Sequence, residues 1–261
     1  MKRLSFFFVI LYLLHPLQYA IGVEDNGLFK ALQDRYKLVF KSRIDAEFFP
    51  PAWLQKPVSV TAMEIGDVEL RRFPSLLKKA LSRYPDGLIM DNLKGIYITK
   101  TLYCYGVRYG ATYANGVIYI TSDGQDQGYS DHYLVGTFHH EFGSILMHNY
   151  FFPSAKWLAS NPAGVYYRYA SDSGYKALMD GNSSLEGNDE LYSQGFVNQY
   201  AATHIEEDFS EFSAFVFTYP IMMRELAGKY PIIDKKLDVW LEFYRSLDKT
   251  MFSRDSLLNP R

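Results

Sequence analysis

The chain has 261 residues, of which 48% are hydrophobic, 21% are charged and 17% are aromatic, a composition that excludes a disordered tail, a coiled coil and a collagen-like fibre. Its 27 Lys and Arg residues nearly balance its 29 Asp and Glu residues, so the formal net charge is only -2. Domains that bind nucleic acid usually carry a strong basic excess. The sequence therefore predicts a globular protein without a nucleic-acid partner.

The first 22 residues are typical of a secretory signal peptide. Lys2 and Arg3 precede an apolar run, residues 4–14, and Pro16 follows it. These eleven residues are too few to span a bilayer core, which needs about 20 residues in a helix. We therefore expect cleavage near residue 22, no membrane span in the remaining chain, and a secreted or periplasmic protein. An uncleaved N-terminal anchor is the alternative.

The mature chain, residues 23–261, is expected to be a single domain whose first part, residues 23–130, mixes helical and β patterns. Its helical stretches have an apolar stripe, and its β stretches are rich in β-branched and aromatic residues. Helices are predicted over 27–40 and 73–83, and strands over 58–62, 95–108 and 116–122. The pair Asn115-Gly116 is typical of a hairpin turn, so we expect the last two β runs to pair as a hairpin.

The second part, residues 131–261, is expected to be mainly helical. Helices are predicted over 132–150, 203–219 and 231–247, and Ser130 or Asp131 is placed to cap the first of them. Between the first two helices, residues 171–195 are rich in Gly, Asn, Ser and Asp, which favours a surface flap. A small sheet with a helical second part makes the fold class α+β.

Cys104 is the only cysteine of the chain. A single cysteine excludes a disulfide within the chain and a thiolate-rich metal site. It lies inside a predicted strand, and free cysteines are among the most buried residues. We expect an inert thiol in the core.

The candidate site begins with a cluster of histidines in the helix predicted over 132–150, namely His132, His139, His140 and His148. His140 and Glu141 open an H-E-x-x-H pattern, in which helical spacing lets two imidazoles bind one zinc ion while the glutamate activates the metal-bound water. Ser144 stands where the second histidine would be, and zinc sites normally use His, Cys or a carboxylate instead of a hydroxyl.

A second cluster of charged residues opens the helix predicted over 203–219. Glu207 and Glu211 are four residues apart and share a helical face, so one could bind the metal while the other holds the imidazole in place. His204 lies three residues before Glu207 and is the candidate to replace the missing imidazole. Asp208 is expected to be a solvated charge.

The segments His140-Glu141-Phe142-Gly143-Ser144 and Glu207-Asp208-Phe209-Ser210-Glu211 together resemble a family of zinc-binding metallopeptidases, a gluzincin-type group with the motifs H-E-F-x-H and E-D-F-x-E. The resemblance covers roughly residues 95–219. It implies a zincin-like fold, in which a small mixed sheet packs on an active-site helix, a zinc cofactor, and peptide or protein substrates. By position it implies zinc ligation by His140 and Glu207, a general-base role for Glu141, and a supporting place for Glu211 behind the ligands. Ser144 departs from the family motif, and we expect it behind the ligands with Glu211.

Two functions follow from these observations. The first is an exported metallopeptidase that hydrolyses peptide bonds with zinc-activated water, provided that another group such as His204 completes the metal site. The second is a degenerate zincin scaffold that acts as a binding or envelope protein without catalysis. Ser144 is the reason for considering both functions, because the fold can form without the metal ligand that this position normally supplies.

Overall fold

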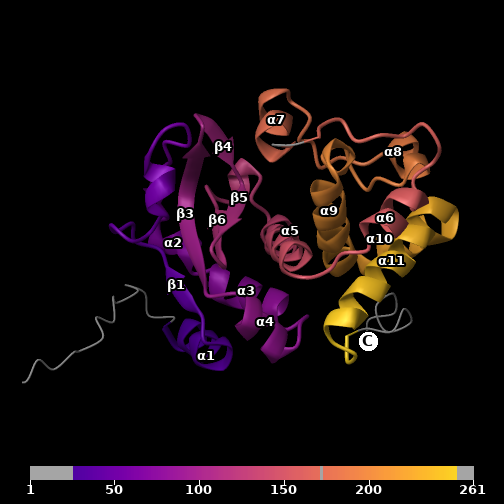
Figure 1. Cartoon of the computed structure of the whole chain (residues 1–261). Coiled ribbons are helices and arrows are strands. Elements are labelled where there is room, and N and C mark those ends of the chain that lie inside the picture. The colour runs from indigo at the N-terminus through magenta and orange to yellow at the C-terminus, as the bar shows by residue number, and fades with distance from the viewer. Residues whose placement is uncertain (1–25, 171–172, 252–261) are drawn as a thin grey trace, which may run out of the picture.

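The computed structural model describes residues 26–170 and 173–251. The predicted signal peptide, residues 1–22, lies outside these ranges. Figure 1 shows a sheet with short helices on one side of the molecule and a helical part on the other, with α5 and α9 adjacent between them. None of the described helices combines the length and the apolar character needed to cross a membrane.

The strands form one mixed sheet in the described part of the chain. The central strand β3 pairs in parallel with β1 and β6 and antiparallel with β2 and β4, and β5 pairs antiparallel with β6 at an edge. The strands are β1 (Val39–Lys41), β2 (Thr61–Glu64), β3 (Gly95–Cys104), β4 (Val107–Tyr109), β5 (Ala111–Ala114) and β6 (Val117–Thr121).

The turn at Asn115-Gly116 forms as predicted, but its two strands are not the predicted pair. Asn115 and Gly116 have φ values of 53° and 80°, which a type I′ hairpin turn requires. The turn joins the short strand β5 to β6, whereas β3 pairs with β6 in parallel. The predicted hairpin between residues 95–108 and 116–122 is therefore wrong, because β5 stands between these two runs in the sequence and takes the antiparallel position.

The helices agree more closely with the sequence pattern. Helix α11 occupies the predicted range 231–247, α5 differs from its predicted range by one residue at each end, and α9 lies inside its predicted range. The helices are α1 (Asn26–Tyr36), α2 (Asp67–Leu70), α3 (Phe73–Leu81), α4 (Asp86–Asn92), α5 (Asp131–Asn149), α6 (Ser154–Ser160), α7 (Ser173–Met179), α8 (Asp189–Gln194), α9 (Ile205–Thr218), α10 (Pro220–Lys229) and α11 (Pro231–Leu247). The α+β class is confirmed.

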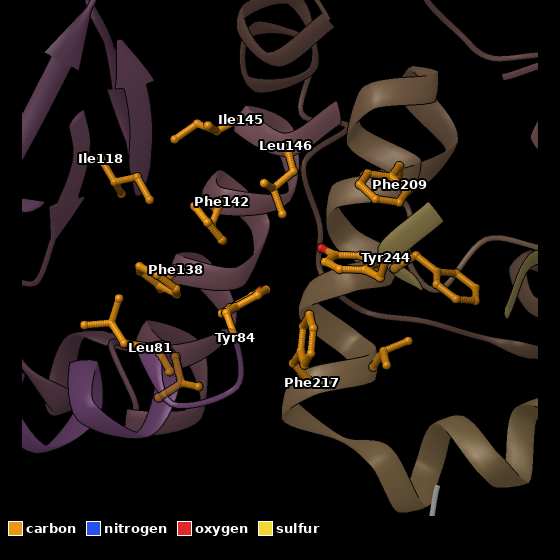
Figure 2. Close-up of a cluster of buried hydrophobic side chains, with 14 of the residues drawn as sticks. Leu81, Tyr84, Ile118, Phe138, Phe142, Ile145, Leu146, Phe209, Phe217 and Tyr244 are labelled. Atoms are coloured by element: carbon orange, nitrogen blue, oxygen red, sulfur yellow. The ribbon is translucent and has the colours of Figure 1, made fainter. Parts of the chain in front are cut away.

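Helix α5 packs between the sheet and α9. Ser130 caps its first turn by accepting a hydrogen bond from the Tyr133 amide, at 3.1 Å. Figure 2 shows Ile118 of β6 facing Phe138 and Phe142 on α5. On the other side of α5, Tyr84 contacts both Phe142 and Phe217 of α9, with ring centroids 4.8 and 5.0 Å apart. One apolar cluster thus joins the sheet to the helical part.

A smaller apolar cluster contains Cys104, as the sequence predicts. Cys104 is 4% exposed and lies among buried aromatic residues, including Phe48 and Tyr119. Burial raises the pKa of its thiol to about 11. A thiol with this pKa is almost entirely protonated at neutral pH and is therefore a poor nucleophile.

The predicted flap over residues 171–195 contains more regular structure than expected. Two short helices, α7 and α8, lie within it, and Asn188 caps α8 by accepting a hydrogen bond from the Leu191 amide at 2.9 Å. Gly195 ends α8 with a φ of 90°, a conformation that glycine adopts without strain. The turn-forming residues therefore act as caps of short helices, and the segment between these helices crosses close to the candidate site.

Candidate functional site

Helices α5 and α9 bring His140 between Glu207 and Glu211. The Nε2 atom of His140 lies 3.3 Å from Oε2 of Glu207, and its Nδ1 atom lies 2.8 Å from Oε1 of Glu211. Glu207 and Glu211 share one face of α9, as their spacing predicts, and this face is turned to α5. Both ring nitrogens of His140 therefore have a carboxylate partner.

This arrangement favours a protonated imidazole. Burial disfavours the charged form of His140, but the hydrogen bonds to Glu207 and Glu211 outweigh it and hold the pKa of His140 well above its ordinary value. In the absence of a bound cation, the imidazolium is the positive charge that balances these two carboxylates.

Two residues outside the predicted site support it. Asn198 donates from Nδ2 to Oε2 of Glu211, at 2.5 Å, so that both oxygens of Glu211 accept a hydrogen bond. The ring of Tyr200 stacks on the His140 ring, with centroids 5.9 Å apart and planes inclined by 10°. Asn198 and Tyr200 lie in the segment before α9, where no motif or periodic pattern could have indicated their role.

Glu141 lies beside this cluster without a hydrogen-bond partner among the described residues. Glu141 is only 7% exposed, and it lines the adjoining cavity. Burial raises the pKa of Glu141 to about 8, and the carboxylates of Glu207, Glu206 and Glu211 add to the effect, whereas His140 opposes it. The negative potential of these carboxylates favours a proton or another cation at Glu141.

Ser144 is turned to α9 and is already hydrogen-bonded. Its Oγ lies 2.7 Å from Oγ of Ser210, and both residues are buried. The small residues at this contact let the helices approach closely, since a Cβ atom added at Gly143 would lie 3.4 Å from Ser213. The position that would carry the second histidine of H-E-x-x-H is thus part of a tight helix contact.

His204 does not join the cluster. It is the N-cap of α9 with an extended backbone, φ -159° and ψ 158°, and its Nδ1 accepts a hydrogen bond from the Glu206 amide at 3.3 Å. The prediction that His204 shares a face with Glu207 assumed a helical backbone at this residue. The extended cap conformation directs its imidazole elsewhere.

Two other histidines of α5 make contacts away from the carboxylates of α9, although His132 lines the same cavity as His140. Nδ1 of His139 lies 2.8 Å from the Tyr84 hydroxyl in the core. The ring of His132 stacks on Tyr219, with centroids 5.7 Å apart. The clustering of histidines in the sequence therefore gives one imidazole at the candidate site.

Asp208 is buried, which overturns its predicted exposure to solvent. Its Oδ2 atom accepts hydrogen bonds from Lys236 Nζ at 2.6 Å, Trp157 Nε1 at 2.7 Å and the Tyr167 hydroxyl at 2.6 Å. Burial raises the pKa of Asp208 against the attraction of Lys236, and burial lowers the pKa of Lys236. The sequence offered no sign of this pair, because Lys236 lies on α11, 28 residues away.

The donor set does not fit a zinc site with three protein ligands. His140 and Glu207 are spaced about as two ligands of one tetrahedral zinc would be, since ligands about 2.0–2.1 Å from the metal are about 3.3 Å apart. Catalytic zinc sites use three protein ligands. Ser144 supplies no such group, and across residues 26–170 and 173–251 no three His, Cys, Asp or Glu side chains are grouped to hold a metal ion.

A cavity of about 430 Å³ adjoins the cluster. It lies between the segment that enters the edge strand β5, the facing sides of α5 and α9, and the segment that follows α7. The side chains around it are mostly apolar and aromatic, with Glu141 and Glu211 as its carboxylates and no Lys or Arg among the described lining residues. The aromatic lining residues are Tyr109, Tyr133, Tyr200, Phe215 and Tyr219.

Two comparisons with known proteins find the family that the motifs resemble. Residues 118–224 match the model of a family described as "Putative zinc-binding metallo-peptidase". A crystal structure from Bacteroides caccae, of a protein described in the same words, is similar over 92% of this chain and 91% of that chain, with 21% sequence identity and a TM-score of 0.58. At this identity the likeness concerns the fold. No curated protein matches the chain.

The matched segment contains both motifs on which the resemblance was based. It includes α5 with His140 and Glu141, and α9 with Glu207 and Glu211. The resemblance of this chain to the zinc-binding metallopeptidase family is therefore confirmed over residues 118–224, and the zincin-like α+β fold is confirmed with it.

Proposed function

We propose that this protein is a degenerate zincin that binds peptides in the cavity beside α5 and α9 without zinc-dependent hydrolysis. The observation that carries the proposal is the place of Ser144, whose hydroxyl is hydrogen-bonded to Ser210 and which leaves the donor set one ligand short. The charge that balances Glu207 and Glu211 is then the imidazolium of His140 in place of a metal ion.

A peptide ligand follows from the family and from the shape of the cavity. Tyr109, Gly110 and Ala111, which lead into the edge strand β5, line one side of the cavity. A strand at a sheet edge can pair with an extended peptide through its backbone groups. The aromatic lining offers apolar contact area for the side chains of such a peptide.

Metal content and peptide hydrolysis test this function. The purified protein, supplied with zinc and then dialysed, is expected to retain no stoichiometric zinc and to leave a mixed peptide pool uncleaved. The double variant Ser144→His with Ser210→Ala provides the imidazole and removes the hydroxyl that Ser144 contacts, and it should retain one equivalent of zinc. Stoichiometric zinc in the parent protein, together with hydrolysis that Glu141→Gln abolishes, would overturn the proposal.

Zinc-dependent peptide hydrolysis is the second candidate function. It is favoured by the family match and by the 3.3 Å spacing of His140 and Glu207. In this case a further ligand from the substrate or from outside the described residues completes the site, and Glu207→Ala should abolish both zinc binding and hydrolysis.

We also propose that the protein is exported and acts in the periplasm or outside the cell. The proposal rests on the charged and apolar pattern of residues 1–22. N-terminal sequencing of the protein recovered from cell fractions tests it, and the expected N-terminus lies near residue 23. Recovery of the intact N-terminus from the cytoplasmic fraction alone would refute export.

A further inference from the structure

We infer that the cavity selects peptides with a basic side chain, and that Glu141 is the group that binds this cation. The inference rests on the proposed peptide-binding function and names the ligand chemistry at the same site. Four observations carry it: Glu141 accepts no hydrogen bond from a described residue, the neighbouring carboxylates already have donors, no Lys or Arg is among the described lining residues, and the walls of the cavity are aromatic.

Glu141 is the carboxylate of this cluster that has no hydrogen-bond partner within the described residues. The residue is only 7% exposed. Little water reaches a carboxylate in so enclosed a site, so a hydrogen-bond donor or a cation from a ligand stabilises it. Since Glu141 lines the cavity, a ligand in the cavity is the natural source of the missing donor.

The neighbouring carboxylates already have donors. Glu211 accepts from His140 and Asn198, Glu207 is paired with His140, and Glu206 accepts from the Tyr113 hydroxyl at 3.0 Å. The carboxylates of Glu206, Glu207 and Glu211 thus lie near Glu141 with one imidazolium among them, and the cluster keeps a negative formal charge. Glu141 is where an additional cation can reduce that charge and also gain a hydrogen bond.

The imidazolium of His140, which lines the cavity, is already paired with Glu207 and Glu211. No Lys or Arg is found among its described lining residues. The walls near Glu141 include Tyr109, Tyr133 and Tyr200, whose rings can contact the methylene groups of a long side chain and attract its charged end. A volume of about 430 Å³ accommodates such a side chain with part of the peptide backbone.

Two peptide pools test this inference. Both contain acetylated and amidated hexapeptides of mixed sequence, with lysine fixed at the third position in one pool and norleucine in the other. Acetylation removes the N-terminal amine, so the side chain carries the only difference in charge. Retention on immobilised protein is measured by mass spectrometry in a buffer that contains a metal chelator.

The expected result is a preference of at least about tenfold for the lysine pool, because a charge-assisted hydrogen bond to a buried carboxylate is lost with norleucine. Glu141→Gln should abolish the preference. The matched control Glu225→Gln, on the exposed surface of α10, should preserve it.

The other outcomes separate the inference from the function on which it rests. Equal retention of both pools by the parent protein overturns the cation preference and leaves peptide binding in place. Retention of neither pool overturns both. A lysine preference that persists in a folded Glu141→Gln variant overturns the role of Glu141. Because the change from lysine to norleucine is made in the peptide, the comparison does not depend on how any variant folds.

Discussion

The two sides of helix α9 carry neighbouring acidic residues in opposite situations. Asp208 faces α11, and its Oδ2 atom accepts three hydrogen bonds, one of them from the buried ammonium of Lys236. One residue earlier, Glu207 faces α5, where Glu207 and Glu211 share the imidazole of His140 and Glu141 has no hydrogen bond from a described residue. On the α11 side, the negative charge of Asp208 is paired with Lys236. On the α5 side, negative charge remains in excess beside the cavity.

This contrast separates a structural role from a binding role. A buried charge that lacks a partner is strongly destabilising, so a fold retains one at a cost unless a ligand supplies the partner. On the Asp208 side, Lys236, Trp157 and Tyr167 of the same chain supply a cation and hydrogen-bond donors to Oδ2, while Oδ1 is buried without a hydrogen bond from a described residue. The Glu141 side is completed by a cation, and the following variants test whether the two sides differ as the structure indicates.

The largest effect is expected for Asp208→Ala. The substitution leaves the Lys236 ammonium and the Trp157 and Tyr167 donors buried without their acceptor, and breaking such a pair from one side costs about 3–5 kcal/mol in the free energy of unfolding. Urea denaturation followed by circular dichroism measures the loss. The double variant Asp208→Ala with Lys236→Met should recover part of it, since it removes the unpaired charge.

Asp126→Asn is the control for this experiment. Asp126 is exposed, so its substitution should change the free energy of unfolding by less than about 0.5 kcal/mol. A loss for Asp208→Ala as small as that of the control would mean that the buried pair is not formed, and the comparison between the two sides of α9 would fail.

An intermediate effect is expected for Asn198→Ala. Asn198 donates to Glu211 and accepts from the Ala201 amide at 2.8 Å, so the variant leaves two buried groups without a partner. Each such loss costs about 1–3 kcal/mol, and partial access from the cavity side should keep the total near the lower part of that range. Urea denaturation of Asn198→Ala beside Gln125→Ala, an exposed residue, measures it; equal midpoints would show that Asn198 does not support Glu211.

The sequence predicts one side of α9 and not the other. Helical spacing places Glu207 and Glu211 on a shared face, and the resemblance to the metallopeptidase family implies that His140 lies with Glu207. Asp208 was expected in solvent because spacing says which residues share a face but not which elements cover the opposite face. The partner Lys236 comes from a helix that packs there only in the complete fold.

A similar limit applies to the sheet and to His204. The Asn115-Gly116 turn is correctly predicted from its residues, but a turn does not determine which run pairs with β6, and the four-residue strand β5 is too short to stand out as a pattern. His204 was placed on the Glu207 face on the assumption of helical φ and ψ. A cap residue has an extended backbone instead, so the periodicity of the helix does not apply to it.

At pH 5 the smallest effect on stability is expected for Glu141→Gln, although Glu141 is as buried as many core residues. No hydrogen bond from a described residue is lost, and removal of the carboxylate relieves its repulsion by Glu206, Glu207 and Glu211.

The pKa of about 8 for Glu141 lies above that of an unfolded glutamate, so ionisation of this group lowers the free energy of unfolding progressively as the pH rises from about 4.3 through 8. The variant should therefore be as stable as the parent at pH 5 and more stable, by about 1 kcal/mol or more, at pH 9. Urea denaturation at the two pH values measures the difference. If Glu141→Gln instead lowers the free energy of unfolding at both pH values by as much as Asn198→Ala, Glu141 has a partner within the fold, and the excess of negative charge that distinguishes the α5 side of α9 does not exist.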